Sequence, residues 1–180
     1  MCQIKDYYKH SNATSKFQGK MSIERLRTKG GWPKLKAKAA ATRHLAQFAC
    51  SLAHEHLDER RQGICTLLCR FYEILGSEQQ FLSPSAKEEL PILGQHLCQL
   101  YCVLANEALD RREKLWKFSP KVHLFQHLTE WQAVTWGNPK YYWVYCDEDL
   151  VGQMIEVAQT CHPTTVAATA MFKWVLLAFD

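Results

Sequence analysis

Apolar residues recur at helical spacing along most of the chain, and strand-like alternation is nearly absent. From Trp32 to about Leu57 the apolar positions fall three or four residues apart and define one face. The same period continues from Asp58, a suitable N-cap, to Gly76, a suitable end. We therefore predict two amphipathic helices here, with Pro33 in the first turn of the earlier one.

Two Ser-Pro pairs indicate further helix starts. Ser83-Pro84 and Ser119-Pro120 each offer a serine N-cap followed by a proline at the first helical position, where a missing N–H costs nothing. The first pair predicts a helix that Pro91 interrupts or kinks and that continues to about Leu115. The second predicts a short helix over residues 120–131.

The last quarter of the chain begins with a turn at Gly137-Asn138-Pro139. Residues 141–145 have strand propensity but no partner run, so we expect a short, packed extended segment. Helical patterns follow over 147–160 and 163–179. Together these elements predict an all-α fold, an irregular bundle of about five to six helices with a flexible N-terminal arm.

Residues 1–31 show no sustained period and end on Gly30-Gly31, so we expect a flexible basic arm there. The rest, residues 32–180, is predicted to form a single helical domain. With 47% apolar residues and six tryptophans, the chain has enough material for a buried core.

Eight cysteines occur without an apolar leader, because residues 1–20 are polar. This combination favours free thiols in a reducing compartment, the nucleus or the cytoplasm. The longest apolar stretch, residues 166–179, is too short to span a bilayer and contains Lys173. We therefore expect an intracellular protein that does not associate with membranes.

Positive charge is concentrated at the front of the chain. Residues 1–43 hold eleven Lys or Arg and two acids, or +9, whereas residues 44–180 hold 11 basic and 16 acidic residues, or −5. A basic segment can bind nucleic-acid phosphate by counterion release, without sequence specificity. The alternative is a solvated leader that binds nothing. The residues expected to contact phosphate are Lys16, Lys20, Arg25, Arg27, Lys29, Lys34, Lys36 and Lys38.

Three pairs of metal-binding residue types are spaced four apart, so each pair shares one side of a helix. They are Cys65 with Cys69, Cys98 with Cys102, and His123 with His127. Two facing pairs would make a four-ligand zinc site. The alternative for the cysteines is core packing, because they lie among Leu, Phe and Tyr.

No complete catalytic constellation is found. A Gly-rich phosphate loop, a nucleophile elbow and a kinase signature are all missing, and His54-Glu55-His56 does not match the HExxH motif. The cluster Asp147-Glu148-Asp149 has the hard oxygen ligands that Mg²⁺ prefers, but helix capping explains it adequately. We therefore expect neither a stand-alone enzyme nor a bound cofactor, with Mg²⁺ or Zn²⁺ as the alternative.

The segment Pro120-Lys121-Val122-His123-Leu124-Phe125-Gln126-His127-Leu128 resembles one found late in DDE-type transposases of the Kyakuja-Dileera-Zisupton and Plavaka kinds. The wider pattern from Pro33 to the acidic cluster resembles transposase-derived open reading frames of dinoflagellate-type genomes. In these transposases the segment ends a helical insertion within an RNase H-like catalytic domain. The resemblance implies that Glu148 corresponds to the third catalytic acid.

The chain departs from this family in one decisive respect. A DDE enzyme needs two further aspartates on strands to hold two metal ions, and this sequence has no upstream strand-borne pair. The first hypothesis is therefore a catalytically incomplete, transposase-derived helical domain that associates with nucleic acid. The alternative is a helical protein-interaction module with no nucleic-acid role. Its partner surface would contain four aromatic rings, those of Trp131, Trp136, Tyr142 and Trp143. The alternative for these rings is packing in the core.

Overall fold

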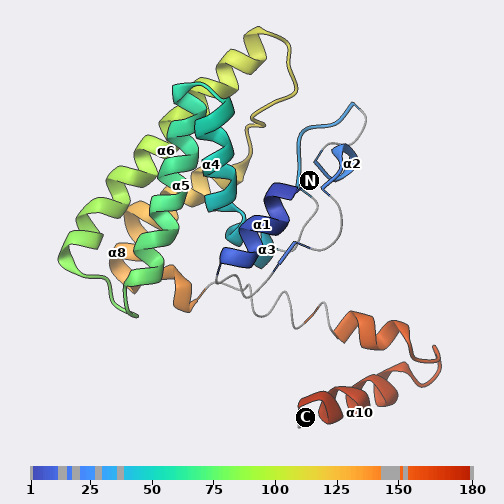
Figure 1. The fold of residues 1–180 in the computed structure, drawn as a ribbon. Helices are drawn as coiled ribbons and strands as arrows, with labels where there is room; N and C mark the ends of the chain where they lie inside the picture. Colours follow the sequence, from blue (N-terminus) through green and yellow to red (C-terminus); the bar gives the residue numbers. More distant parts are fainter. Residues whose placement is uncertain are drawn as a thin grey trace. The chain divides into compact units, whose positions relative to one another are not determined.

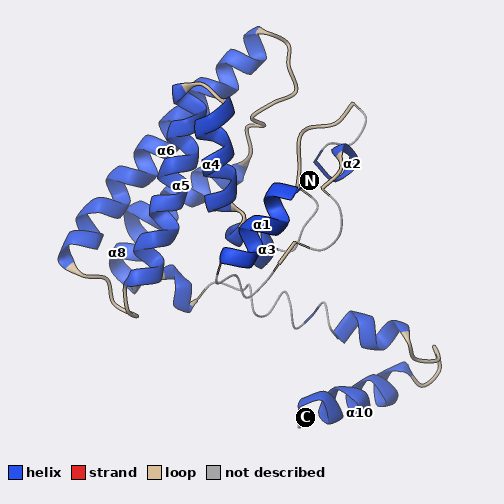
Figure 2. Cartoon of the chain, viewed as in Figure 1, coloured by secondary structure: helices blue, strands red, loops and turns tan. Residues whose placement is uncertain are grey.

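The computed structural model describes residues 2–11, 16–17, 21–26, 30–35, 39–142, 151 and 154–178. Within these ranges every regular element is a helix and none is a strand (Figure 2). The predicted all-α fold is confirmed. Contacts between Cα atoms group the chain into two units, residues 1–142 and 143–180. The predicted boundary after residue 31 lies within the first of them.

Three helices form the centre of the first unit: α4 (Ala46–His56), α5 (Glu59–Ser77) and α6 (Pro84–Asp110). They lie side by side, α5 against both of the others (Figure 1). The apolar stripes predicted from their spacing face one another, and they bury Leu75, Leu90 and Leu104 to 1% exposure or less. This burial is the main source of stability for the packed helices.

The predicted starts of two of these helices are confirmed, and their caps explain why. The Asp58 side chain accepts hydrogen bonds from the backbone N–H groups of Arg60 and Arg61, which have no partner inside the helix. The Ser83 hydroxyl accepts one from Ala86, and Pro84 occupies the first position of α6.

The first predicted helix is divided in two. Its described part consists of α3 (Ala39–His44) and α4, which meet at Leu45, and Pro33 lies outside both. The N–H of Leu45 is shared between the carbonyl oxygens of Ala41 at 3.2 Å and Thr42 at 3.1 Å, as is common where a helix ends. Leu45 itself is buried, so the chain bends around a core side chain.

We call residues 1–38 the front segment. It contains two helices that the sequence pattern does not predict, α1 (Cys2–His10) and α2 (Ile23–Leu26). The Tyr7 hydroxyl donates to the carbonyl of His44 at 2.9 Å, and the Tyr7 ring lies 5.4 Å from that of Phe48. A nine-residue helix is marginal alone, so these contacts are what stabilise α1.

Of the two effects predicted for Pro91, an interruption or a kink of the helix, the interruption is not found. The helix runs unbroken from Pro84 to Asp110, and Pro91 lies in its second turn, where its ring removes one bond to the carbonyl of Lys87. The predicted continuation to Leu115 is wrong, because residues 111–119 are irregular.

The next segment is a nearly continuous helix of three parts. It consists of α7 (Pro120–His127), the π-helix η1 (Leu128–Gln132) and α8 (Ala133–Trp136). The predicted start at Pro120 is confirmed. Gly137 follows with a φ of 97°, and the short 3-10 helix η2 (Pro139–Tyr141) comes next. Tyr141 belongs to η2, so it is not extended as predicted. Residues 143–145 lie outside the described part.

In the second unit, α10 (Val166–Ala178) lies within the predicted range 163–179, and residues 154–159 are helical within the predicted range 147–160. Asp147, Glu148 and Asp149 lie outside the described residues, as does Trp143. Among the helices of the described ranges, none has the length and apolar character needed to cross a bilayer.

Candidate nucleic-acid interface

Three of the eight predicted phosphate-contacting residues belong to the part of the chain that the structure describes. Lys16 and Lys34 are exposed. Arg25 is half-buried, and its guanidinium lies 5.1 Å from the centre of the buried Phe17 ring. Such a cation–π contact fixes the arginine without neutralising it. The other five, which the structure does not describe, are Lys20, Arg27, Lys29, Lys36 and Lys38.

The front segment is tied to a distant part of the chain at Gly30. The backbone N–H of Lys34 donates to the carbonyl of Leu26 at 2.7 Å, so the two ends of this stretch are held together. Gly30 adopts a φ of 70°, which glycine reaches without strain. Its carbonyl accepts a hydrogen bond from Nζ of Lys114 at 2.7 Å, a residue 84 positions later.

Lys114 belongs to a second basic run, which we call the basic corner, residues 111–121. It contains five basic residues and one acid, Glu113, so its net charge is five minus one, or +4. All five basic side chains are exposed, and within the described ranges none of them forms an ion pair. They are Arg111, Arg112, Lys114, Lys117 and Lys121. Through Lys114 and Gly30, the structure therefore joins this second basic run to the basic front of the chain.

Sequence reasoning missed the basic corner because charge was summed over residues 44–180, where the net value is −5. The net charge of a window of about ten residues, close to the length of a typical helix, reveals it. Its two arginines also directly follow the C-terminus of α6, where a positive charge interacts favourably with the negative end of the helix dipole. This gives Arg111 and Arg112 a structural role that does not require a ligand.

Aromatic packing fixes the conformation of the basic corner. The Tyr101 hydroxyl donates to the carbonyl of Lys117 at 2.8 Å, and its ring meets that of Trp116 edge to face at 5.5 Å. Partial burial raises the pKa of Tyr101. Arg112 and Trp116 adopt left-handed φ angles of 55° and 52°, which these residue types rarely do. Contacts of this kind hold the corner in one shape against local strain.

An open hollow lies where the two basic segments meet. Its volume is about 480 Å³, and it is lined by Gly30, Arg112, Glu113, Lys114 and Leu115. Its lining carries two cations and one acid, so the net charge of the hollow is positive and favours an anionic ligand over a cationic one.

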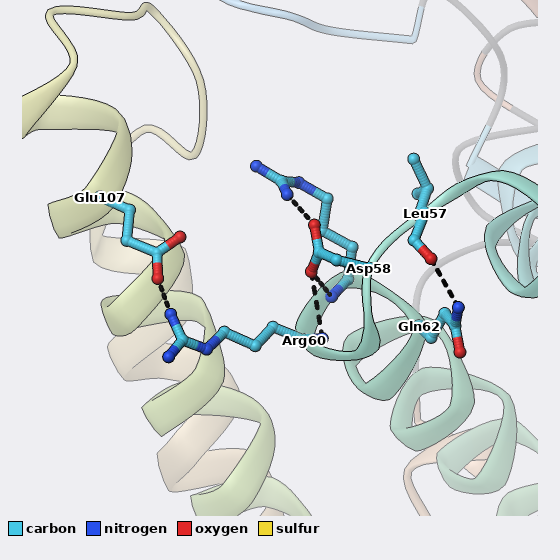
Figure 3. A network of polar contacts seen from close by, with 6 residues as sticks. Leu57, Asp58, Arg60, Gln62 and Glu107 are labelled. Carbon is cyan, nitrogen blue, oxygen red and sulfur yellow. Dashed lines mark hydrogen bonds and ion pairs between the residues drawn. The ribbon is translucent and has the colours of Figure 1, made fainter.

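Nearby arginines, by contrast, are neutralised by acids (Figure 3). The guanidinium of Arg60, on α5, forms an ion pair with Glu107 near the end of α6, and Arg61 pairs with Asp58. Hydrogen bonds, first of all that from the backbone N–H of Arg61, lower the pKa of Asp58. Charge paired in this way is not available to phosphate, so the basic corner differs from this network because its cations form no ion pair with a described residue.

The candidate metal ligands are brought together only in part. Nε2 of His123 and Nε2 of His127 lie 2.9 Å apart, and both rings are exposed. Cys65 and Cys69 lie near Cys50 on α4: burial chiefly, and Cys50 in addition, raise the pKa of both thiols, that of Cys69 to about 12. Within the described residues no three His, Cys, Asp or Glu side chains are grouped to hold a metal, so the hypothesised four-ligand zinc site is not formed among them.

Of the four aromatic rings proposed as a partner surface, the three that the structure describes are not in the core. Trp131 and Trp136 are 52% and 54% exposed, with ring centres 4.8 Å apart, and Tyr142 is 40% exposed. Two adjacent, half-exposed indoles are unusual for a surface that only water contacts.

Comparison with protein-family models, curated proteins and solved structures finds no match to this chain.

Proposed function

We propose that this chain is a transposase-derived helical domain, without a complete catalytic site of its own, that binds nucleic acid non-specifically through a composite basic surface. The surface consists of the front segment up to Lys38 and the basic corner. The hydrogen bond from Lys114 to Gly30 carries the proposal, because it joins two basic segments that are far apart in the sequence. The ancestry rests on the resemblance of residues 120–128.

The chemistry of the surface favours the phosphate backbone over the bases. In the basic corner the charged groups are mainly lysines and arginines that form no ion pair with a described residue, and beside them lies an open hollow rather than a helix shaped to enter a groove. Binding of this kind releases counterions, so the logarithm of affinity falls by about 0.9 per phosphate contact for each tenfold rise in salt.

The test is a salt series of binding to duplex DNA, measured by fluorescence anisotropy with several unrelated sequences. We expect Arg112→Gln with Lys117→Gln to lower the slope by about 1.8, because two phosphate contacts are removed. The matched control, Lys87→Gln with Lys173→Gln, removes the same charge from exposed or half-exposed sites elsewhere and should leave the slope nearly unchanged. No binding at low salt, or equal slopes for both variants, would contradict the proposal.

A protein-interaction module is the second candidate, and the exposed pair Trp131 and Trp136 favours it. Tryptophan is enriched among residues that dominate binding energy at interfaces. This candidate predicts partners that remain bound after nuclease treatment and are lost in Trp131→Ala with Trp136→Ala. Phe118→Ala, which removes another exposed ring, is the control. Partners that disappear with the nuclease would instead support nucleic-acid binding.

A further inference from the structure

His123 and His127 form a pair whose geometry matches two adjacent ligands of one metal ion. Their Nε2 atoms lie 2.9 Å apart and their ring centres 4.3 Å apart, with an angle of 69° between the ring planes. Metal–nitrogen bonds of about 2.05 Å place two nitrogens about 2.9 Å apart at a right angle, but about 3.3 Å apart at a tetrahedral angle. The spacing is set in the metal-free pair by the hydrogen bond between the rings, and it lies closer to the right-angled value than to the tetrahedral one.

The helix that carries the pair is held firmly on its other side. The Phe125 ring meets the Phe71 ring at 5.1 Å, edge to face, and the carbonyl of Val122 accepts a weak bond from Sγ of Cys98 at 3.6 Å. One turn later, the buried Thr129 packs against Gly94 of α6. Because these contacts fix the backbone of α7, binding of an ion has to order only the two histidine side chains, which already form a hydrogen bond with each other.

We propose that His123 and His127 bind a late first-row divalent cation, Cu²⁺ or Ni²⁺, through their Nε2 atoms, with water at the remaining coordination positions. Imidazole nitrogens suit these ions, which also prefer right-angled geometry, whereas structural Zn²⁺ sites are tetrahedral with four protein ligands. The described residues supply no third protein ligand. The site is therefore open to solvent and to exchange.

Binding requires a change of tautomer. In the metal-free pair one Nε2–H donates to the other Nε2, whereas the metal needs a lone pair on both. The proton of the donating ring therefore moves from Nε2 to Nδ1, so that both rings carry Nδ1–H. Two neutral rings remain neutral, and no net proton is released.

The experiment uses the full, untagged chain with Ni²⁺ as the probe, because Cu²⁺ oxidises thiols and the chain has eight cysteines. Calorimetric titration should give one ion per chain for the wild type. Either His123→Gln or His127→Gln should weaken binding by about a hundredfold, since the advantage of linking two ligands is lost. The matched control is His54→Gln with His56→Gln, an exposed pair only two residues apart, which should bind like the wild type.

A second measurement makes the test independent of any variant's stability. Substoichiometric Ni²⁺ should broaden the imidazole NMR signals of His123 and His127 in the wild-type protein before those of the other histidines. Absence of saturable binding, equal affinity in His123→Gln with His127→Gln, or tighter binding of Zn²⁺ than of Ni²⁺ would overturn the proposal.

Discussion

Gly94 of α6 and Thr129 of η1 meet so closely that a Cβ atom on Gly94 would lie 1.9 Å from Oγ1 of Thr129. Thr129 is fully buried, and its hydroxyl donates to the carbonyls of Phe125 at 3.2 Å and Gln126 at 3.1 Å. These bonds hold the hydroxyl in place within the π-helical turn. The helix crossing therefore depends on the absence of a side chain at residue 94.

Gly94→Ala should destabilise the protein by about 1–3 kcal/mol or more, because neither helix can move without disturbing its packing. Gly76→Ala is the matched control: its Cβ would meet nothing within 4 Å. That variant should be neutral or gain up to about 1 kcal/mol from the reduced freedom of the unfolded chain. Urea denaturation followed by circular dichroism measures both. Equal stabilities would show that the close approach does not constrain the fold.

Local chemistry explains which features could be predicted from the sequence. The starts of α5 and α6 depend on Asp58 and Ser83, whose side chains act on N–H groups two or three residues away. The break at Leu45 coincides instead with a buried side chain, and α6 continues through Pro91 while packed against α5. Contacts of that kind connect residues that no local pattern relates.

The same distinction applies to the candidate sites. The charge of the front segment is visible in a count of residues, and the spacing of His123 and His127 predicts that they are neighbours. The 2.9 Å between their Nε2 atoms needs coordinates, because it depends on side-chain torsions. The contact of Gly30 with Lys114 spans 84 residues, and nothing in either segment predicts it.

The buried side-chain amide of Asn138 forms hydrogen bonds that we expect to stabilise the end of α5. Asn138 is 1% exposed, and its Nδ2 donates to the carbonyls of Leu75, Glu78 and Gln79 at 3.0–3.2 Å. Asn138→Leu keeps the number of side-chain heavy atoms but leaves these carbonyls, at the end of α5, without their donor. We expect a loss of about 1–3 kcal/mol in the free energy of unfolding.

The control for this substitution is Asn106→Leu, at an exposed position on α6, which should change stability by at most about 0.5 kcal/mol. If both variants unfold at the same urea concentration, the Asn138 amide does not stabilise the end of α5.

The ion pair between Arg70 and Glu89 predicts a dependence of stability on pH. Arg70 on α5 donates to both carboxylate oxygens of Glu89 on α6, at 2.6 and 2.9 Å, and these hydrogen bonds lower the pKa of Glu89 below 4.5. A carboxyl group whose pKa is lower in the folded state stabilises it above the unfolded pKa, and this contribution is lost as the pH falls.

Glu89→Gln should therefore lower the urea midpoint slightly at pH 7, because the pair is exposed, and the difference from wild type should shrink as the pH is lowered below 4.5. High salt at pH 7 should shrink it as well. Glu88→Gln serves as the control, since Glu88 forms no ion pair with a described residue. A difference that persisted at low pH would assign the effect to packing rather than charge.

Lys114→Met tests whether the two basic segments act as one surface. The substitution removes a charge from the basic corner and also the hydrogen bond to Gly30, whereas Lys117→Met removes a charge alone. If the surface is composite, Lys114→Met should weaken DNA binding more than Lys117→Met and should also speed hydrogen exchange at the Lys34 amide, which donates to Leu26. Each should lower the salt slope by about 0.9. Equal losses of affinity, with exchange at Lys34 unchanged, would mean that the front segment and the basic corner bind phosphate separately.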